Sequence, residues 1–203
     1  MIAIVDYGMG NIASISNAFK SLGYDICISD RMEDLEKASH IILPGVGSFQ
    51  AAASEIERRG LREVLQHLAI TKPILGICLG MQLLFTEGLE GGRSKGLNLI
   101  PGTVEKIKTE SILPHIGWNT LNFRNSEYAD YQNKYMYFVH SYVANTPSEY
   151  IIATTNYGAN IPSIVRNGNV IGMQFHPEKS GEMGRKLIQA FLQAGEKAKM
   201  GVM

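Results

Sequence analysis

The chain has 203 residues, a length that suits one domain with a sizeable core, and we expect a single domain over residues 1–203. Lysine plus arginine and aspartate plus glutamate both number 19, so the net charge is zero and nothing in the composition favours a nucleic-acid partner. The most apolar stretch, residues 70–85, is interrupted by lysine, proline and glutamine, which argues against a membrane span, and the N-terminal apolar run is too short for a signal peptide. The two cysteines are typical of a reduced cytoplasmic protein rather than of a disulfide scaffold.

The first half of the chain alternates predicted strands and helices. Continuous apolar runs predict buried strands at residues 2–5 and 40–43, and a further one begins at Ile74. Residues 24–29 also predict a strand. Apolar residues at helical spacing predict helices, which we place at residues 12–22, 32–37, 50–59 and 61–70. This alternation indicates an α/β fold, with an open, mostly parallel, flavodoxin-like sheet flanked by helices. Ligands bind such sheets beyond the carboxyl ends of the strands.

Two glycine-rich turns follow the first and third strands. The turn at residues 6–11 has neither of the common phosphate-loop spacings, so we interpret it as structural. The loop at residues 44–49 leaves its strand at the edge where ligands bind. Cys27, within the second strand, has no glycine turn around it and is expected to be a thiol of the core.

Residues 74–85 form the most informative stretch. Gly76-Ile-Cys-Leu-Gly80 follows an apolar strand and precedes a predicted helix at residues 81–85. This is the pattern of a nucleophile elbow, in which glycines two residues before and after the nucleophile permit a tight turn. The elbow alone leaves open whether Cys78 is catalytic or an ordinary buried cysteine.

The second half is expected to be rich in β-strands and partly antiparallel. Residues 86–99 are polar and glycine-rich and predict an irregular loop, whereas residues 103–108, 135–142 and 150–155 predict strands. Residues 163–175 predict a hairpin on a type I′ turn at Asn167-Gly168. Residues 124–134 are interpreted as polar surface, a last helix begins near Gly181, and the chain is expected to fray from Lys197.

The end of that hairpin supplies a possible partner for Cys78. His176 and Glu178 leave the strand together around Pro177. A histidine that can take the thiol proton, oriented by a carboxylate, is what a nucleophilic cysteine requires. The five histidines have no metal-ligand spacing, so we predict neither a metal nor another cofactor.

Two separated motifs, residues 76–82 and 173–178, resemble those of the class I (triad) glutamine amidotransferases. Within that family, residues 6–11, 44–49, 115–119, 138–142 and 176–180 are similar to the glutaminase subunits of imidazole glycerol phosphate synthases. The resemblance covers nearly the whole chain. It implies a heterodimer in which ammonia from glutamine passes to a (β/α)8-barrel cyclase that makes imidazole glycerol phosphate and AICAR in histidine biosynthesis.

The resemblance also implies roles for individual residues. Cys78 would attack the glutamine amide, His176 would act as general base and then acid, and Glu178 would orient His176. The other implied roles are oxyanion binding by Gly45, Val46, Gly47 and Leu79, substrate binding by Gln82, Glu90, Ser141 and Tyr142, and cyclase contacts by Trp118, Tyr137 and Lys179. Because glycines let a peptide rotate at little steric cost, the oxyanion hole is expected to form only when the partner is occupied.

Two alternatives stay open at this stage. The chain could be the glutaminase of another synthase, such as one that makes pyridoxal phosphate or aminodeoxychorismate. It could also be a non-catalytic flavodoxin-like module with Cys78 as a redox sensor, although a sensor has no need of His176 and Glu178.

Overall fold

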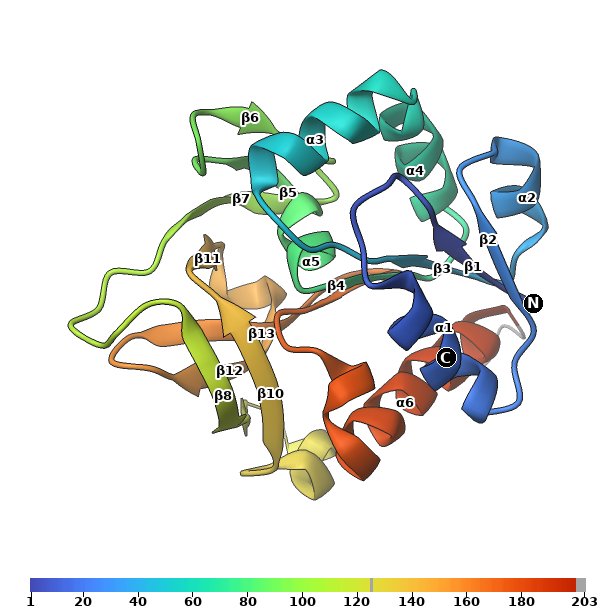
Figure 1. Cartoon of the computed structure of the whole chain (residues 1–203). Helices are drawn as coiled ribbons and strands as arrows, with labels where there is room; N and C mark the ends of the chain where they lie inside the picture. The colour runs from blue at the N-terminus through green and yellow to red at the C-terminus, as the bar shows by residue number, and fades with distance from the viewer. Residues whose placement is uncertain (125, 200–203) are drawn as a thin grey trace.

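An eight-stranded mixed sheet runs through the molecule (Figure 1). The computed structural model describes the backbone of residues 1–124 and 126–199 and the side chains of residues 1–124 and 129–194. In spatial order the strands are β2 (Ile26–Ser29), β1 (Ile2–Val5), β3 (His40–Leu43), β4 (Ile74–Ile77), β14 (Val170–Met173), β13 (Asn160–Asn167), β12 (Ile151–Asn156) and β9 (Asn122–Phe123).

The first five of these strands are parallel, in agreement with the predicted mostly parallel sheet, although the place of β14 among them was not predicted. β1 pairs with both β2 and β3, β3 with β4, and β4 with β14, all in parallel register. The remaining three strands continue the sheet in antiparallel pairs. Strand β14 therefore connects the two halves of the chain, because it returns from the C-terminal hairpin to lie directly beside β4.

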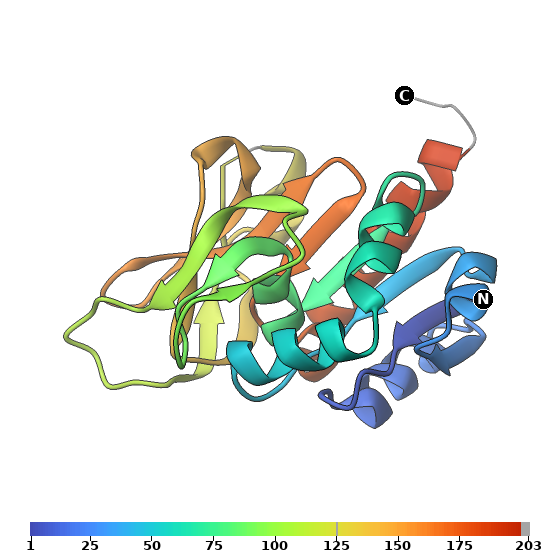
Figure 2. The ribbon, with the colours of Figure 1, turned by 90° about the horizontal axis from the view of Figure 1, so that it is seen from above.

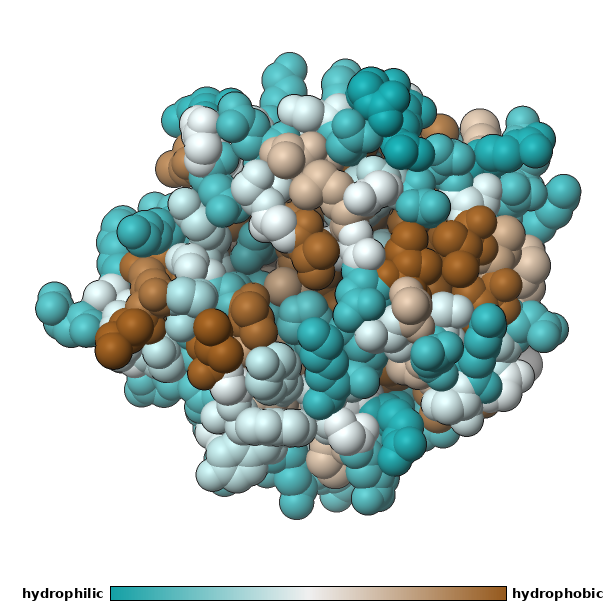
Figure 3. All heavy atoms as spheres, in the orientation of Figure 1, coloured by the Kyte–Doolittle hydropathy of each residue, from teal (hydrophilic) through white to brown (hydrophobic). Residues whose placement is uncertain are grey.

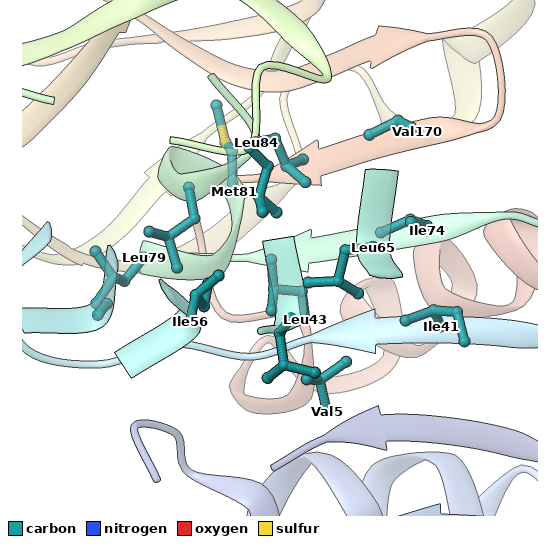
Figure 4. Close-up of a cluster of buried hydrophobic side chains, with 14 of the residues drawn as sticks. Val5, Ile41, Leu43, Ile56, Leu65, Ile74, Leu79, Met81, Leu84 and Val170 are labelled. Carbon is teal, nitrogen blue, oxygen red and sulfur yellow. The ribbon is translucent and has the colours of Figure 1, made fainter. Parts of the chain in front are cut away.

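Helices cover both faces of the parallel part. Alternate residues along each strand point to opposite faces; Ala3 and Val5 join one apolar cluster, and Ile2 and Ile4 join the other. Figure 4 shows the first cluster, where strand residues meet side chains from the helices above the sheet. The helices on that face are α2 (Met32–Lys37), α3 (Phe49–Arg58), α4 (Leu61–Ala69) and α5 (Leu79–Leu83), and those on the opposite face are α1 (Ile12–Ser21) and α6 (Gly181–Lys199).

Two smaller sheets lie at the other end of the molecule, beyond β14 (Figure 2). One contains β11 (Tyr142–Asn145), β7 (Ile100–Lys106), β5 (Phe85–Gly88) and β6 (Ser94–Lys95), and the other pairs β8 (His115–Thr120) with β10 (Tyr135–His140). Short 3-10 helices occupy Ser126–Tyr131, Ser148–Tyr150 and Pro177–Lys179. Among the described residues, no helix combines the length and hydropathy that a membrane span requires.

Three predicted elements of the second half have different limits. Residues 86–99 are not an irregular loop, since they contain most of β5 and all of β6, and β5 pairs with β6 on one side and with β7 on the other. Strand β7 begins at Ile100 rather than Thr103, because a register shift in its pairing with β5 accommodates Pro101 and Gly102. The elbow helix covers Leu79–Leu83 and not residues 81–85.

The predicted strand 135–142 is in fact two strands. β10 follows β8 as far as His140, which lies opposite His115, and β11 then pairs with β7 from Tyr142. The chain thus changes sheet at Ser141, and this break brings residues 139–142 to the site described below.

The predicted hairpin is present, but its turn is not of type I′. Asn167 pairs with Val170, so the two loop residues are Gly168 and Asn169. Only Gly168 has a positive φ, of 57°, whereas a type I′ turn requires positive φ at both loop residues. A glycine at the first loop position is the arrangement typical of a type II′ turn.

Two further expectations are corrected and one is confirmed. Cys27 is half-buried rather than in the core, because β2 is an edge strand. The expectation of polar surface at residues 124–134 is confirmed where side chains are described, since Arg124 and residues 129–134 are exposed or half-buried; the segment contains the 3-10 helix Ser126–Tyr131, and residue 125 lies outside the described residues. The backbone is helical to Lys199, beyond the expected fraying point at Lys197, and residues 200–203 lie outside the described residues.

Candidate active site

Cys78 occupies a tight turn between β4 and α5. Its φ of 56° and ψ of −114° lie in a region that non-glycine residues rarely adopt. Neighbouring glycines permit the turn: a Cβ on Gly76 would lie 2.6 Å from the Gly80 carbonyl oxygen, and one on Gly80 would collide with the carbonyl of Leu43. The Cys78 backbone N–H donates to the Met173 carbonyl at 2.8 Å, which ties the elbow to β14.

His176 and Glu178 follow β14, and because β14 pairs with β4 they emerge beside the elbow. The His176 Nδ1 lies 2.8 Å from the Glu178 Oε1, and both side chains are buried. The backbone also holds His176 in place, since its N–H donates to the Tyr137 carbonyl at 2.9 Å and its carbonyl accepts from the Ser180 hydroxyl at 2.7 Å. Glu178 therefore fixes which ring nitrogen faces away from Cys78.

The His176 ring favours its protonated form. Burial alone would lower the pKa of His176, but hydrogen bonds to Cys78 and Glu178 and the charges of these groups outweigh burial and raise that pKa to about 9. A ring with this pKa can keep a proton taken from the Cys78 thiol at neutral pH. The geometry thus provides a nucleophile, a proton acceptor and an orienting carboxylate.

A cavity of about 280 Å³ opens beside Cys78 and His176. Nine residues predicted for catalysis, oxyanion binding or substrate binding line it: Val46, Gly47, Cys78, Leu79, Gln82, Glu90, Ser141, Tyr142 and His176. Pro114, Val139 and His140 complete its wall. Ser141, where the chain passes from one sheet to the other, and the elbow at Cys78 therefore contribute to one cavity, although they are about sixty positions apart in the sequence.

Two predicted residues lie directly behind the cavity wall. Glu178 is behind His176, as described above. Gly45 is buried against the elbow, where a Cβ would come within 2.6 Å of the Gly80 backbone nitrogen and 2.8 Å of the Tyr7 hydroxyl oxygen. Glu178 thus supports His176, and Gly45 lets the loop of residues 44–49 pack closely against the elbow.

The loop of residues 44–49 leaves β3 and forms one wall of the cavity. The Tyr7 hydroxyl donates to the Pro44 carbonyl at 2.7 Å, and Ser48 caps α3 by accepting from Ala51 N–H at 3.4 Å. Between these two anchors Gly47 has a φ of 103°, which favours glycine. Within the described residues the backbone N–H groups of Val46 and Gly47 have no acceptor, and both residues line the cavity.

Two predicted substrate residues have fixed side chains. One carboxylate oxygen of Glu90 accepts from the Phe49 N–H at 2.7 Å. The Gln82 amide nitrogen donates to the Tyr142 carbonyl at 3.2 Å and to the Gln174 Oε1 at 3.1 Å. The polar end of the cavity is thus held by hydrogen bonds to other parts of the chain.

The residues predicted to contact a partner are not in the cavity. Trp118 and Tyr137 are cross-strand neighbours on β8 and β10, with ring centroids 5.9 Å apart, and Lys179 is exposed. Ile116 and Tyr135 are also exposed on the same pair of strands. Figure 3 shows apolar side chains gathered over the region where Figure 1 draws β8 and the adjoining end of β10.

Sequence reasoning assigned no role to four residues at the site: Tyr7, His115, His140 and Gln174. The two histidines occur in the motifs 115–119 and 138–142, but only the register of β8 with β10 brings them together. Tyr7 and Gln174 lie within the motifs 6–11 and 173–178, but no local pattern distinguishes them from core residues. In the described part of the chain, no group of three or more His, Cys, Asp or Glu side chains could hold a metal ion.

Comparison with known proteins agrees with this arrangement. The family described as "Glutamine amidotransferase class-I" matches residues 3–194, and the chain belongs to this family. A crystal structure of a glutamine amidotransferase superimposes with a TM-score of 0.75 at 20% identity, covering 96% of this chain and 98% of that one, which supports the fold.

Relatives of higher sequence identity share the name of one particular subunit. The chain is 46% identical over 196 residues to the imidazole glycerol phosphate synthase subunit HisH of Listeria monocytogenes, covering 94% of each chain. It is 48% identical over 197 residues to the subunit of the same name from Lactococcus lactis, covering 95% of this chain and 98% of that one.

Proposed function

We propose that this glutamine amidotransferase hydrolyses glutamine with Cys78, His176 and Glu178 as its catalytic triad. The observation that carries the proposal is the joint position of these groups: Cys78 and His176 line one cavity, and the buried Glu178 carboxylate lies 2.8 Å from the His176 Nδ1. The triad, the cavity and the loop of residues 44–49 belong to one amidotransferase domain that extends over the whole chain.

The reaction follows from this geometry. His176 takes the Cys78 thiol proton, and the Cys78 sulfur attacks the side-chain amide carbon of glutamine. The C–N bond then breaks, His176 gives its proton to the departing nitrogen, and ammonia leaves a glutamyl thioester on Cys78. His176 next removes a proton from water, the resulting hydroxide attacks the thioester, the C–S bond breaks, and glutamate is released with the thiol restored.

Backbone and side-chain groups around the cavity complete the site. The tetrahedral intermediates carry an oxyanion, for which we propose the N–H groups of Leu79 and of the loop containing Gly45, Val46 and Gly47. The substrate's amino-acid end carries one positive and one negative group, and Gln82, Glu90, Ser141 and Tyr142 supply the polar contacts to it. In this proposal the loop of residues 44–49 adopts its productive peptide orientation only when the partner is occupied.

The ammonia passes to a cyclase partner within an imidazole glycerol phosphate synthase of histidine biosynthesis. The relatives at 46–48% identity are named as subunits of that synthase, which favours this assignment over the glutaminase of another synthase or a redox module. We propose that the partner is a (β/α)8 barrel that docks on the surface formed by Ile116, Trp118, Tyr137 and Lys179. Exposed apolar and aromatic side chains of this kind are enriched in protein interfaces. The cytoplasm is the proposed location, since thiols such as Cys27 and Cys78 stay reduced there.

Glutamate release by the complex tests the proposal. The wild-type chain with the cyclase and its ligand is expected to release glutamate, and the Cys78→Ala variant none, whereas Cys27→Ala serves as the matched control with activity retained. Absence of glutamate release by the wild-type complex would overturn the assignment. Equal activity of the isolated chain and the ligand-occupied complex would overturn only the partner-dependent oxyanion hole.

A further inference from the structure

A line of hydrogen bonds through two buried histidines ends at the cavity wall, and the catalytic steps above do not use it. Asn119 Nδ2 lies 3.2 Å from His115 Nε2, His115 Nδ1 lies 3.0 Å from His140 Nε2, and His140 Nδ1 lies 2.8 Å from the Tyr142 carbonyl. The two histidines are only 2% and 6% exposed. Buried polar groups of this kind are specified by their partners, so the direction of each bond can be worked out.

The direction follows from the carbonyl end. A carbonyl oxygen only accepts, so His140 carries its hydrogen on Nδ1 and donates it to the Tyr142 carbonyl. The Nε2 of a neutral His140 is then an acceptor, and His115 must donate to it from its own Nδ1. Both rings are therefore neutral Nδ1–H tautomers. Burial agrees with this assignment, since it lowers the pKa of each of the two histidines to about 4.

Asn119 completes the line at its other end. Its amide nitrogen donates to the remaining acceptor, His115 Nε2, and also to the Asn156 carbonyl at 2.9 Å. Its amide oxygen accepts from the Thr120 N–H at 2.8 Å, so the orientation of the amide is fixed independently of the histidine. Stacking also restrains the His115 ring, whose centroid lies 4.0 Å from that of Tyr157.

The line continues into the cavity through the Tyr142 carbonyl. This oxygen accepts a second hydrogen bond, from Gln82 Nε2 at 3.2 Å, and the other Gln82 N–H goes to Gln174 Oε1 at 3.1 Å. Both hydrogens of the Gln82 amide are thus used by protein acceptors. Within the described residues its oxygen has no donor, and Gln82 lines the cavity, so this oxygen is available to a ligand.

We propose that His140 and His115 are positioning residues that hold the Gln82 amide oxygen toward the cavity, where it accepts a hydrogen bond from the α-ammonium group of a free amino acid. The inference rests on the proposed function for the identity of that ligand, glutamine. It adds the reason why the amide presents oxygen rather than nitrogen: an amide turned by 180° would direct its N–H groups at a cation and leave its oxygen facing the carbonyl of Tyr142.

The two faces of strand β8 carry residues with different proposed roles. Successive residues of a strand point to opposite faces, so His115 and Asn119 face the interior while Ile116 and Trp118 face outward. The hydrogen-bond line therefore runs along the inner face of the strand whose outer face is proposed to dock the cyclase.

Two substitutions at one position separate the two bonds of His140. In His140→Gln, the side-chain amide lies three bonds from Cβ, as does the histidine Nε2, so it can meet His115 but no longer donates to the Tyr142 carbonyl. In His140→Asn, the amide nitrogen lies two bonds from Cβ, as does Nδ1, and the donor to Tyr142 is kept. His67→Gln, on the exposed face of α4, is the matched control.

Steady-state kinetics of the complex should distinguish these variants. His140→Gln is expected to raise the KM for glutamine roughly tenfold, the effect of one lost hydrogen bond, with kcat changed about twofold or less. His140→Asn should restore most of the wild-type KM, and His67→Gln should not change it. An active His140→Gln variant with unchanged KM, or a lowered kcat shared equally by both variants, would overturn the inference, whereas an inactive wild-type complex would instead overturn the proposed function.

A spectroscopic measurement tests the inference without any turnover. In ¹⁵N-histidine spectra of the unmodified chain, two of the five side chains should be neutral Nδ1–H tautomers from pH 8 down to about pH 5, as their lowered pKa values imply. Both signals should be absent from a His115→Phe, His140→Phe double variant. The inference would be overturned if the two signals lost in the double variant belonged to Nε2–H tautomers, or to rings that protonate near pH 6.5.

Discussion

Replacing Glu178 by glutamine tests how the carboxylate acts on His176. The pKa of His176 is raised from 6.5 to about 9, a change of about 2.5 units. At about 1.4 kcal/mol per unit, this is a net of roughly 3 kcal/mol in favour of the charged ring, and Cys78 and Glu178 together contribute more than this because burial opposes them. If Glu178 supplies about half of that contribution, its charge is worth at least about one pKa unit.

Glutamine at position 178 can keep a hydrogen bond to Nδ1 but has no charge. We therefore expect the pKa of His176 to fall by about one unit, and kcat to fall at least tenfold because the protonated ring is less stable in the transition state. The KM for glutamine should change little, since Glu178 does not line the cavity. Titration of His176 by NMR gives the pKa, and glutamate release by the complex gives kcat and KM.

Glu182→Gln is the matched control, because Glu182 is an exposed carboxylate four positions further on whose ion pair, with Lys186, lies on the surface. This control should behave as wild type in both measurements. An unchanged titration of His176 in the Glu178→Gln variant would show that Cys78 alone sets the charge of the ring. A KM effect as large as the kcat effect would show that Glu178 contacts the substrate.

Three further variants test the fold, the docking surface and the buried histidines. Gly80→Ala places a methyl group against the Leu43 carbonyl, so the chain should lose about 3 kcal/mol or more of unfolding free energy in urea titrations, and a loss below about 1 kcal/mol would contradict the close approach. Trp118→Ala should weaken cyclase binding by about 2 kcal/mol, roughly thirtyfold in Kd by calorimetry, whereas Ile70→Ala, which removes another exposed apolar side chain, should not weaken it. His140 has a folded pKa of about 4, below the ordinary 6.5, so its neutral form stabilises the fold above pH 6.5 and that contribution is lost as the pH falls toward 4. The unfolding free energy of His140→Asn should consequently fall less between pH 7 and pH 4.5 than that of wild type, and an equal fall would refute this.

The predictable parts of this protein are those that local patterns specify. Strand β4 and the turn at Cys78 could be recognised because an apolar run and two glycines leave few alternatives. The helices followed from apolar spacing in the same way. Strand β5 was missed because a single buried aromatic, Phe85, is followed by threonine, glutamate and glycine, and pairing with β7 rather than strand propensity determines its conformation.

The site was predictable to the extent that its residues stand in motifs. Cys78 and His176 meet because β14 pairs with β4, a contact that the alternation of strands suggests but does not specify. His115 and His140 could not be paired beforehand, since their contact requires the register of two strands that are separated in the sequence by residues 121–134. The resemblance to a family identified the motifs that contain these histidines, but not the bond between them.

Three of the residues that line the cavity lie where a strand or helix is interrupted. Cys78 has a positive φ, a conformation that costs of order 1–3 kcal/mol and must be held by its surroundings, here by the bond from its N–H to Met173 and by the glycines beside it. Ser141 marks the point where one strand leaves its sheet for another, and Gly47 turns the loop that follows β3. Each interruption aims a nucleophile, a side chain or a backbone N–H at the same space, which uninterrupted strands and helices would have filled with core residues. The local departures from strand and helix geometry are therefore the structural cause of the site.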